Sequence, residues 1–358
     1  MEILHIENLS FSYPKSEKKA LDNINLSFKA GSFNVICGES GCGKTTLLKM
    51  LKRELTPVGD ESGEVFYRGK SLAALEPRVS AAEIGFVMQN PESQIVTDKV
   101  WHELAFGLES LGEDNEVIRR RVAEMSSYFG IEGWFGKKTN ELSGGQKQLL
   151  NLASVMVMQP NILILDEPTS RLDPIAASDF IATLCKMNRE LSLTVIIAEH
   201  RLEELLPAAD SVTVMENGRV IAAWAPREVS GRLKVISENQ RMLSALPSAT
   251  RIFEKLGLPG ICPLTVREGR DFLEKSFGGA PIAEYKEKPY THSDSAAIEL
   301  KNVWFRYERN LPDVLKNTSL KVFEGESYFV LGGNGVGKTT ALGVIAGLNS
   351  AYRGKTVI

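Results

Sequence analysis

Two stretches of the sequence combine residue types that suit phosphate chemistry. Residues 143–146 form a polar, glycine-rich loop ahead of a helical pattern, and such a loop presents backbone N–H groups to an anion. The apolar run 162–165 ends in Asp166 and Glu167. Adjacent carboxylates at a strand end can hold Mg²⁺ and orient an attacking water. Neither stretch is specific alone, but the chain also contains a phosphate-binding loop, twice.

The first phosphate-binding loop runs from Gly38 to Thr46 and matches the pattern GxxxxGK[ST]. A short apolar run, residues 32–37, precedes it and a helical pattern over 45–55 follows, which is the context that the motif requires. In such a loop the lysine reaches the β- and γ-phosphates and the hydroxyl that follows it ligates Mg²⁺. We predict ATP contacts from these loop residues: Gly38, Ser40, Gly41, Cys42, Gly43, Lys44, Thr45 and Thr46. We interpret Cys42 as a small loop-filling residue, not an oxidisable thiol.

The elements that must position these loops alternate between strand and helix. Strand patterns cover 4–13, 20–28, 32–37, 64–67, 84–88, 162–165 and 194–198, and a closing hairpin covers 212–223. Helical patterns cover 45–55, 100–129, 146–158 and 174–188. This order predicts a parallel sheet covered by helices, with Gln89, Asp166, Glu167 and His200 at the carboxyl ends of its strands, where α/β proteins bind ligands.

The composition restricts the class of protein. The chain has 358 residues, of which 43% are hydrophobic and 24% charged, as in an ordinary globular protein of two or three domains. Its net charge of −3 gives no reason to expect a nucleic-acid partner. No apolar run of about 18 residues predicts a membrane span, and the N-terminus lacks the pattern of a secretion signal. The four cysteines have neither a zinc nor a disulfide spacing, which fits a reducing cytoplasm.

With these motifs in order, residues 1 to about 228 resemble an ATP-binding-cassette (ABC) ATPase. Tyr13 matches the aromatic residue that stacks on adenine, residues 38–46 the Walker A loop and Gln89 the Q-loop. Residues 142–146 match the signature loop, 162–167 the Walker B strand, 170–173 the D-loop and His200 the switch histidine.

This resemblance implies an α/β P-loop fold of the ABC type, with a mostly parallel sheet, an antiparallel β subdomain and a helical subdomain. It implies that Glu167, His200 and Gln89 act in ATP hydrolysis and that Thr45, Gln89 and Asp166 hold Mg²⁺. It also implies that ATP bound to one domain contacts the signature of another, here Ser143, Gly144, Gly145 and Gln146, with Asp173 in the D-loop.

A narrower resemblance concerns residues 89–96 and 103–109, which are similar to ATPases of energy-coupling factor (ECF) transporters. These import vitamins or transition-metal ions through a membrane coupling subunit and a substrate-binding membrane subunit, from the cytoplasmic face of the membrane. The alternative is that residues 90–91 are a simple turn and that Phe106 and Leu108 are core residues. Leu149 and Glu199 depart from the commoner family pattern of arginine and threonine at these positions.

The rival function is a soluble twin-cassette ATPase that acts on ribosomes or another macromolecular assembly. The ECF-like segment and the absence of a long, basic helical linker are arguments against this rival function.

The second half of the chain restarts the pattern at a constant offset of 294 residues, as in 302 against 8 and 338 against 44. It predicts a second ATP site: Tyr307, Asn334, Gly335, Gly337, Lys338, Thr339 and Thr340. We expect a complete ABC domain over 1–228, a helical connector over 229–296 with helices at 241–256 and 266–277, and the first part of a second ABC domain over 297–358.

Since the sequence stops on the strand that should match 64–67, we interpret it as a truncated piece of a protein with two fused ATPase domains. The first Walker A loop would need a signature in trans, so we expect ATP binding but poor hydrolysis from this piece alone. We also expect its C-terminal part to be poorly stable.

Overall fold

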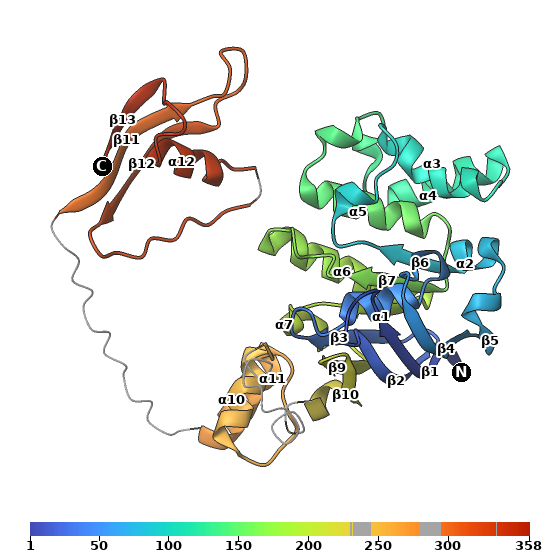
Figure 1. The fold of residues 1–358 in the computed structure, drawn as a ribbon. Coiled ribbons are helices and arrows are strands. Elements are labelled where there is room, and N and C mark those ends of the chain that lie inside the picture. The colour runs from blue at the N-terminus through green and yellow to red at the C-terminus, as the bar shows by residue number, and fades with distance from the viewer. Residues whose placement is uncertain (230, 232–244, 279–294, 334) are drawn as a thin grey trace. The chain divides into compact units, whose positions relative to one another are not determined.

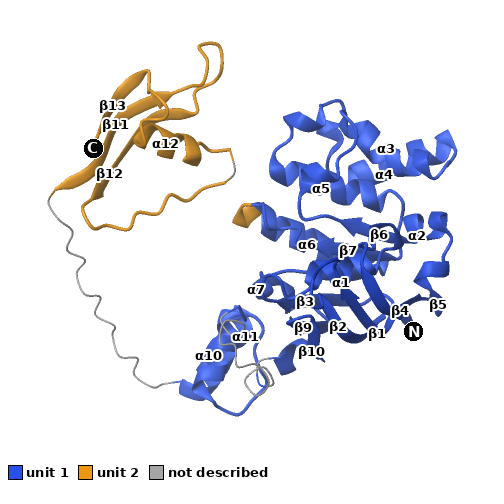
Figure 2. Cartoon of the chain, in the orientation of Figure 1, with its two compact units in different colours: residues 1–172, 176–278 blue, residues 173–175, 279–358 orange. Residues whose placement is uncertain are grey.

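A computed structural model describes residues 1–229, 231, 245–278, 295–333 and 335–358 (Figure 1). Two compact units result (Figure 2): residues 1–172 and 176–278 form the first, and residues 173–175 and 279–358 the second. We describe each unit by itself.

A six-stranded sheet in the order β10-β9-β3-β8-β7-β6 forms the centre of the first unit. Its strands are β3 (Phe33–Gly38), β6 (Ile84–Val87), β7 (Ile162–Asp166), β8 (Thr194–Ala198), β9 (Ser211–Glu216) and β10 (Arg219–Trp224). The pairs β6–β7, β7–β8, β3–β8 and β3–β9 are parallel, and β10 closes the edge as an antiparallel hairpin with β9. The parallel ladder therefore brings the carboxyl ends of β3, β6, β7 and β8 to one edge of the sheet.

The parallel strands are buried on both faces, which explains why they read as continuous apolar runs. On one face, side chains such as Leu163 and Val195 join a core with helix α6 (Pro174–Leu191) and helix α7 (Leu202–Leu205). On the other face, Ile164 and Ile196 join a core with helix α1 (Lys44–Met50).

That second core is completed by a four-stranded antiparallel sheet in the order β2-β1-β4-β5. Its strands are β1 (Glu2–Ser12), β2 (Leu21–Lys29), β4 (Asp60–Tyr67) and β5 (Lys70–Ser71). Helix α2 (Pro77–Glu83), which the sequence patterns did not indicate, leads from this sheet into β6.

A separate helical part contains α3 (Val100–Ser110), α4 (Asn115–Phe129) and α5 (Gly144–Met156), gathered at one end of the unit in Figure 1. Its own core includes Leu104, Val122 and Leu150. The helical pattern predicted over 100–129 corresponds to two helices, because the chain turns at Gly112, whose φ of 69° lies in the left-handed region. The helix expected over 45–55 is also shorter, since α1 ends at Met50 and a 3₁₀ turn follows at Arg53–Leu55.

Two further helices, α10 (Ser248–Leu256) and α11 (Val266–Phe277), pack together through Phe253 and Phe272. Arg227 joins them to the sheet-bearing part, since its guanidinium donates to both carboxylate oxygens of Glu268. The helix expected over 241–256 begins only at Ser248, after Pro247, and residues 241–244 lie outside the described part.

The second unit contains β11 (Ala296–Phe305), β12 (Leu315–Phe323), α12 (Lys338–Ile345) and β13 (Arg353–Val357), with strand order β12-β11-β13. Its β11–β12 pair repeats β1–β2 at the offset of 294 residues, since Leu300 faces Leu320 as Ile6 faces Leu26. The third strand, β13, pairs three residues earlier in the chain than the offset of 294 residues predicts. Lys301 faces Lys355 where Glu7 faces Glu64, so the connection after α12 is shorter than the one after α1.

Candidate active site

The first phosphate-binding loop links β3 to α1, and its backbone is built around glycines. Gly41 and Gly43 have φ values of 81° and 106°, which L side chains rarely adopt. A Cβ on Gly43 would also lie 2.5 Å from the carbonyl oxygen of Ala20. The Lys44 side chain turns back and its Nζ donates to the carbonyls of Gly38 and Glu39, at 2.9 and 3.1 Å. The loop is therefore closed around its own lysine.

The loop lines a cavity of about 540 Å³ together with residues from distant parts of the sequence. The predicted residues that line it are Tyr13, Ser40, Gly41, Gly43, Lys44, Thr45, Thr46, Gln89 and Glu167. Sequence reasoning missed Ser16, Lys18, Lys19, Ala20 and Gly218. The position of residues 14–20 directly after Tyr13 was the available signal for the first four. The sequence marked Gly218 only as part of a hairpin turn, not as a site residue.

Tyr13 stands beside this loop. Its hydroxyl lies 3.1 Å from Thr46 Oγ1, and its ring packs edge-on against Phe11 at a centroid distance of 5.0 Å. The side chain is 40% exposed and so presents ring surface to the cavity that it lines.

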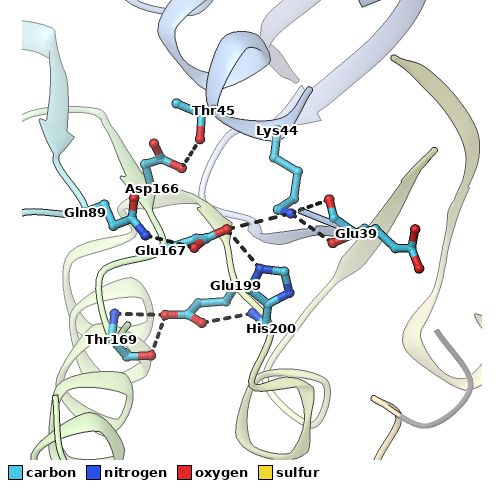
Figure 3. A network of polar contacts seen from close by, with 10 residues as sticks. Glu39, Lys44, Thr45, Gln89, Asp166, Glu167, Thr169, Glu199 and His200 are labelled. Carbon is cyan, nitrogen blue, oxygen red and sulfur yellow. Dashed lines mark hydrogen bonds and ion pairs between the residues drawn. The ribbon is translucent and has the colours of Figure 1, made fainter. Parts of the chain in front are cut away.

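Glu167 is the centre of the polar network in Figure 3. Its Oε1 lies 2.9 Å from His200 Nε2 and 3.7 Å from Lys44 Nζ, and its Oε2 accepts a hydrogen bond of 3.1 Å from Gln89 Nε2. The Glu167 backbone has a φ of +42°, which is unusual for a residue with a side chain. Thus the ends of β6, β7 and β8 bring all three predicted catalytic side chains together.

Asp166 lies beside Glu167 but is 5% exposed, and its Oδ1 accepts a hydrogen bond of 3.0 Å from Thr45 Oγ1. Burial, and to a lesser degree the neighbouring Glu167 charge, raises the pKa of Asp166 above its ordinary value. A buried carboxylate next to a hydroxyl is an oxygen donor set that fits Mg²⁺, whose charge would favour the ionised form.

Glu199 follows β8 and is 2% exposed. Its carboxylate accepts hydrogen bonds from the backbone N–H and the hydroxyl of Thr169 and from the backbone N–H of His200 (Figure 3). The sequence marked this residue only as a departure from the common pattern.

The signature loop begins helix α5. The Ser143 hydroxyl accepts a hydrogen bond from Gln146 N, and the Gln146 side chain accepts one from Ser143 N, which together form a capping box. None of the predicted signature residues, Ser143, Gly144, Gly145 and Gln146, lines the cavity that contains Lys44. Asp173 accepts a hydrogen bond from Ile175 N and so caps the start of α6.

The second loop has much of the geometry of the first. Lys338 Nζ donates to the carbonyls of Gly332 and Gly333, and the Tyr307 hydroxyl lies 3.0 Å from Thr340 Oγ1. Gly335 and Gly337 have φ values of 80° and 95°. Asn334 lies outside the described residues, and Thr339 follows Lys338 in α12.

The cysteines near the first loop have no nucleophilic character. Burial raises the pKa of Cys37 to about 12 and also raises the pKa of Cys42, so both thiols stay protonated near neutral pH.

A glycine loop at a helix N-terminus, a buried lysine and paired carboxylates at the end of a strand of the same sheet define a nucleotide-binding P-loop ATPase. The sequence model of the ABC transporter family matches residues 21–170 and 315–358. A Bacillus anthracis protein assigned as an ABC transporter ATP-binding protein is 41% identical over 98% of the chain. The chain therefore belongs to the ABC transporter family, whose ATPases bind ATP with Mg²⁺ and hydrolyse it.

A relative from Methanosarcina acetivorans with the same assignment is 31% identical over 99% of the chain. The chain spans 62% and 61% of the length of these two relatives. Among solved structures, cbiO1 from Clostridium perfringens, described as part of the ABC transporter complex cbiONQ, is 34% identical. It matches 72% of this chain and 99% of its own, with a TM-score of 0.59.

The ATP-binding cassette MJ0796, in a dimeric post-hydrolysis state bound to ADP and Pi, is 26% identical. The match covers 63% of this chain and 99% of the cassette, with a TM-score of 0.56. These likenesses confirm the predicted fold class of an ABC-type P-loop ATPase. Among the described residues, no helix combines the length and the apolar character that crossing a membrane requires.

Proposed function

We propose that this chain is the ATP-hydrolysing part of an ECF-type importer for a vitamin or a transition-metal ion. The observation that carries the hydrolytic role is the position of Glu167, which Gln89 and His200 contact from neighbouring strand ends, with Lys44 within 4 Å. A carboxylate held this way at the rim of a phosphate-binding cavity is placed to accept a proton from an attacking water.

The roles of the other residues follow from their positions. Lys44 and the loop N–H groups bind the phosphates, and Tyr13 offers its ring to the adenine. His200 contacts Glu167 and so orients its carboxylate, and the family pattern implies that His200 also contacts the γ-phosphate. Mg²⁺ would be held by Thr45, Asp166 and Gln89, and it supplies charge neutralisation on the phosphate oxygens. Ser143, Gly144, Gly145 and Gln146 lie outside this cavity, which agrees with their use on ATP bound elsewhere.

The partner surface in this proposal is the segment after Gln89. Gln94 holds its turn through hydrogen bonds with Met88 N and Phe86 O, and buried Glu103 accepts from Val96 N and Thr97 N. This scaffold leaves apolar side chains on the surface: Val96 is 66% exposed, Trp101 40% and Phe106 38%, while Leu108 is buried. The interpretation of Phe106 as a core residue is therefore wrong, whereas for Leu108 it is correct.

We assign this surface to the membrane coupling subunit, which places the protein at the cytoplasmic face of the cell membrane. The likeness to cbiO1, described as part of cbiONQ, supports this assignment. We further propose the predicted division into an ABC domain over 1–228, a connector over 229–296 and the beginning of a second ABC domain over 297–358, since the second unit repeats the strand pairing of β1 with β2.

Affinity capture of the full-length protein from detergent-solubilised cells tests the proposal. We expect small polytopic membrane proteins in stoichiometric amounts, and the substrate-binding subunit among them would identify the solute. Val96→Asp should reduce this capture at least tenfold, because a charge on an exposed apolar contact must be desolvated on binding. Val58→Asp is the matched control, at a residue that is 86% exposed and lies in the turn before β4, outside the segment. Ribosomal proteins without a membrane partner would overturn the transporter function and leave the ATPase chemistry intact.

A further inference from the structure

Glu199 is a buried carboxylate between two loops of the site. Three donors point at it: the backbone N–H of Thr169 at 2.9 Å, the Thr169 hydroxyl, and the backbone N–H of His200 at 2.9 Å. The two oxygens of a carboxylate are both acceptors, so this side chain can satisfy all three donors at once. The side chain thus joins the turn after β7 to the turn after β8.

Each of these turns carries a residue of the proposed hydrolytic pair. Thr169 lies two residues after Glu167, in a turn closed by the hydrogen bond from Ser170 N to Glu167 O. His200 directly follows Glu199, and its Nε2 reaches Glu167 Oε1 at 2.9 Å. The backbones are also joined, since Glu167 N donates to Ala198 O at 2.9 Å. Hydrogen bonds thus join Thr169 to Glu199, Glu199 to the His200 backbone and the His200 ring to Glu167 (Figure 3), and the chain through Pro168 connects Glu167 back to Thr169.

We propose that Glu199 is a positioning residue that holds the His200 imidazole on Glu167 during ATP hydrolysis. The threonine common at this position carries one short hydroxyl, whereas the glutamate reaches across and binds both turns. The inference rests on the proposed hydrolytic roles of Glu167 and His200. It extends them by assigning the geometry of that pair to a side chain that does not line the phosphate-binding cavity.

Glu199→Gln is the first test, because glutamine keeps the shape but replaces one acceptor oxygen by an NH₂ group. Either the Thr169 donors or the His200 N–H then face a donor, so one turn is released. We expect kcat for ATP hydrolysis by the full-length protein to fall about 10- to 100-fold with KM for ATP changed less than about threefold, since positioning acts on the reaction more than on binding.

A double-mutant cycle with His200→Ala separates positioning from general damage. If Glu199 acts through His200, Glu199→Gln lowers kcat little further once the imidazole is gone. Equal fold losses in both backgrounds would overturn the proposal. A kcat within twofold of wild type in Glu199→Gln would also overturn it, and the ATPase assignment would stand as long as Glu167→Gln remains inactive. An active Glu167→Gln would refute the proposed function itself.

Two further variants control for folding. Glu83→Gln alters a comparable network, in which Glu83 accepts hydrogen bonds from Tyr67 and Asn161. This network lies at the amino ends of β6 and β7, away from Glu167, so kcat should not change. If Glu199→Gln fails to fold, Thr169→Val removes a single donor at constant shape, and kcat should fall about threefold. An unchanged kcat in that variant would contradict the proposal.

Discussion

The two phosphate-binding loops of the chain, residues 38–46 and 332–340, are nearly the same locally but lie in different surroundings. Gly43 and Gly337 have φ values of 106° and 95°, and Lys44 and Lys338 each bond the two carbonyls at the start of their loop. Each loop also has a tyrosine hydroxyl about 3 Å from its last threonine. The loop conformation is therefore encoded within a few residues and does not need the rest of the site.

The strand before each loop shows the difference. Phe33–Gly38 is buried throughout and pairs with β8 and β9. In the described part of the second unit, residues 327–333 form no strand, and Phe329 and Leu331 are 81% and 89% exposed. A parallel strand needs partners from elsewhere in the chain, and only the first loop has them. We therefore expect the first loop to be the better formed ATP site among the described residues.

The sharpest test of this contrast is Glu167→Gln, which removes the proposed base while keeping the shape. Hydrolysis should fall roughly 10²- to 10⁴-fold, as is typical for loss of a general base. ATP affinity should change less than about threefold, because Lys44 and the loop N–H groups are untouched. Steady-state phosphate release and binding of a fluorescent ATP analogue measure the two effects. Residual hydrolysis near the wild-type rate would mean that the first loop does not define the reaction centre.

A matched pair of lysine variants compares the loops directly. Lys44→Ala should weaken ATP binding about 100-fold, since a charge-assisted contact to phosphate is lost from a buried position. Lys338→Ala should change the affinity of the chain for ATP less than about threefold. Equal losses from the two variants would break the comparison and show that the second loop binds ATP as well as the first.

The strands before the loops can be compared by stability. Val35 and Phe329 occupy equivalent positions, but Val35 is fully buried and Phe329 is 81% exposed. Val35→Ala should destabilise the first unit by about 2 kcal/mol, because it leaves a cavity in the core. Phe329→Ala should stay within about 0.5 kcal/mol. Urea unfolding followed by circular dichroism gives both values, and a large effect of Phe329→Ala would indicate that residues 327–333 are packed in solution.

The smallest expected effect concerns Asp166, whose pKa burial raises in the folded state. Stability from the protonated carboxyl is fully present below the ordinary pKa of 3.8 and is lost as pH rises through the raised value. At neutral pH without Mg²⁺, Asp166→Asn should therefore raise the melting temperature by about 2 °C, and the gain should vanish as the pH approaches 4. Scanning calorimetry checks this, and a variant that melts lower than wild type at pH 7 would contradict it.

Much of the fold could be predicted because its signals are local. The apolar runs of β7 and β8 and the Asn217-Gly218 turn of the β9–β10 hairpin follow from periodicity and turn chemistry. The errors lie where the helical periodicity of the sequence continues across a residue at which the helix itself begins or ends. Gly112 separates α3 from α4, and Pro247 precedes the start of α10. The predicted roles of Glu167, His200 and Gln89 came from the family pattern, while the contacts among them came from the structure.

The two phosphate loops could be predicted from the sequence, because the glycines with positive φ and the lysine that folds back on its own loop lie within one short motif. The tertiary structure supplied the surroundings of the first loop. The parallel ladder of β6, β7, β8 and β3 brings Gln89, Glu167 and His200 to one edge of the sheet across more than a hundred residues of chain. The same ladder buries Glu199 between the turns after β7 and β8, and such a position depends on packing that no sequence period records.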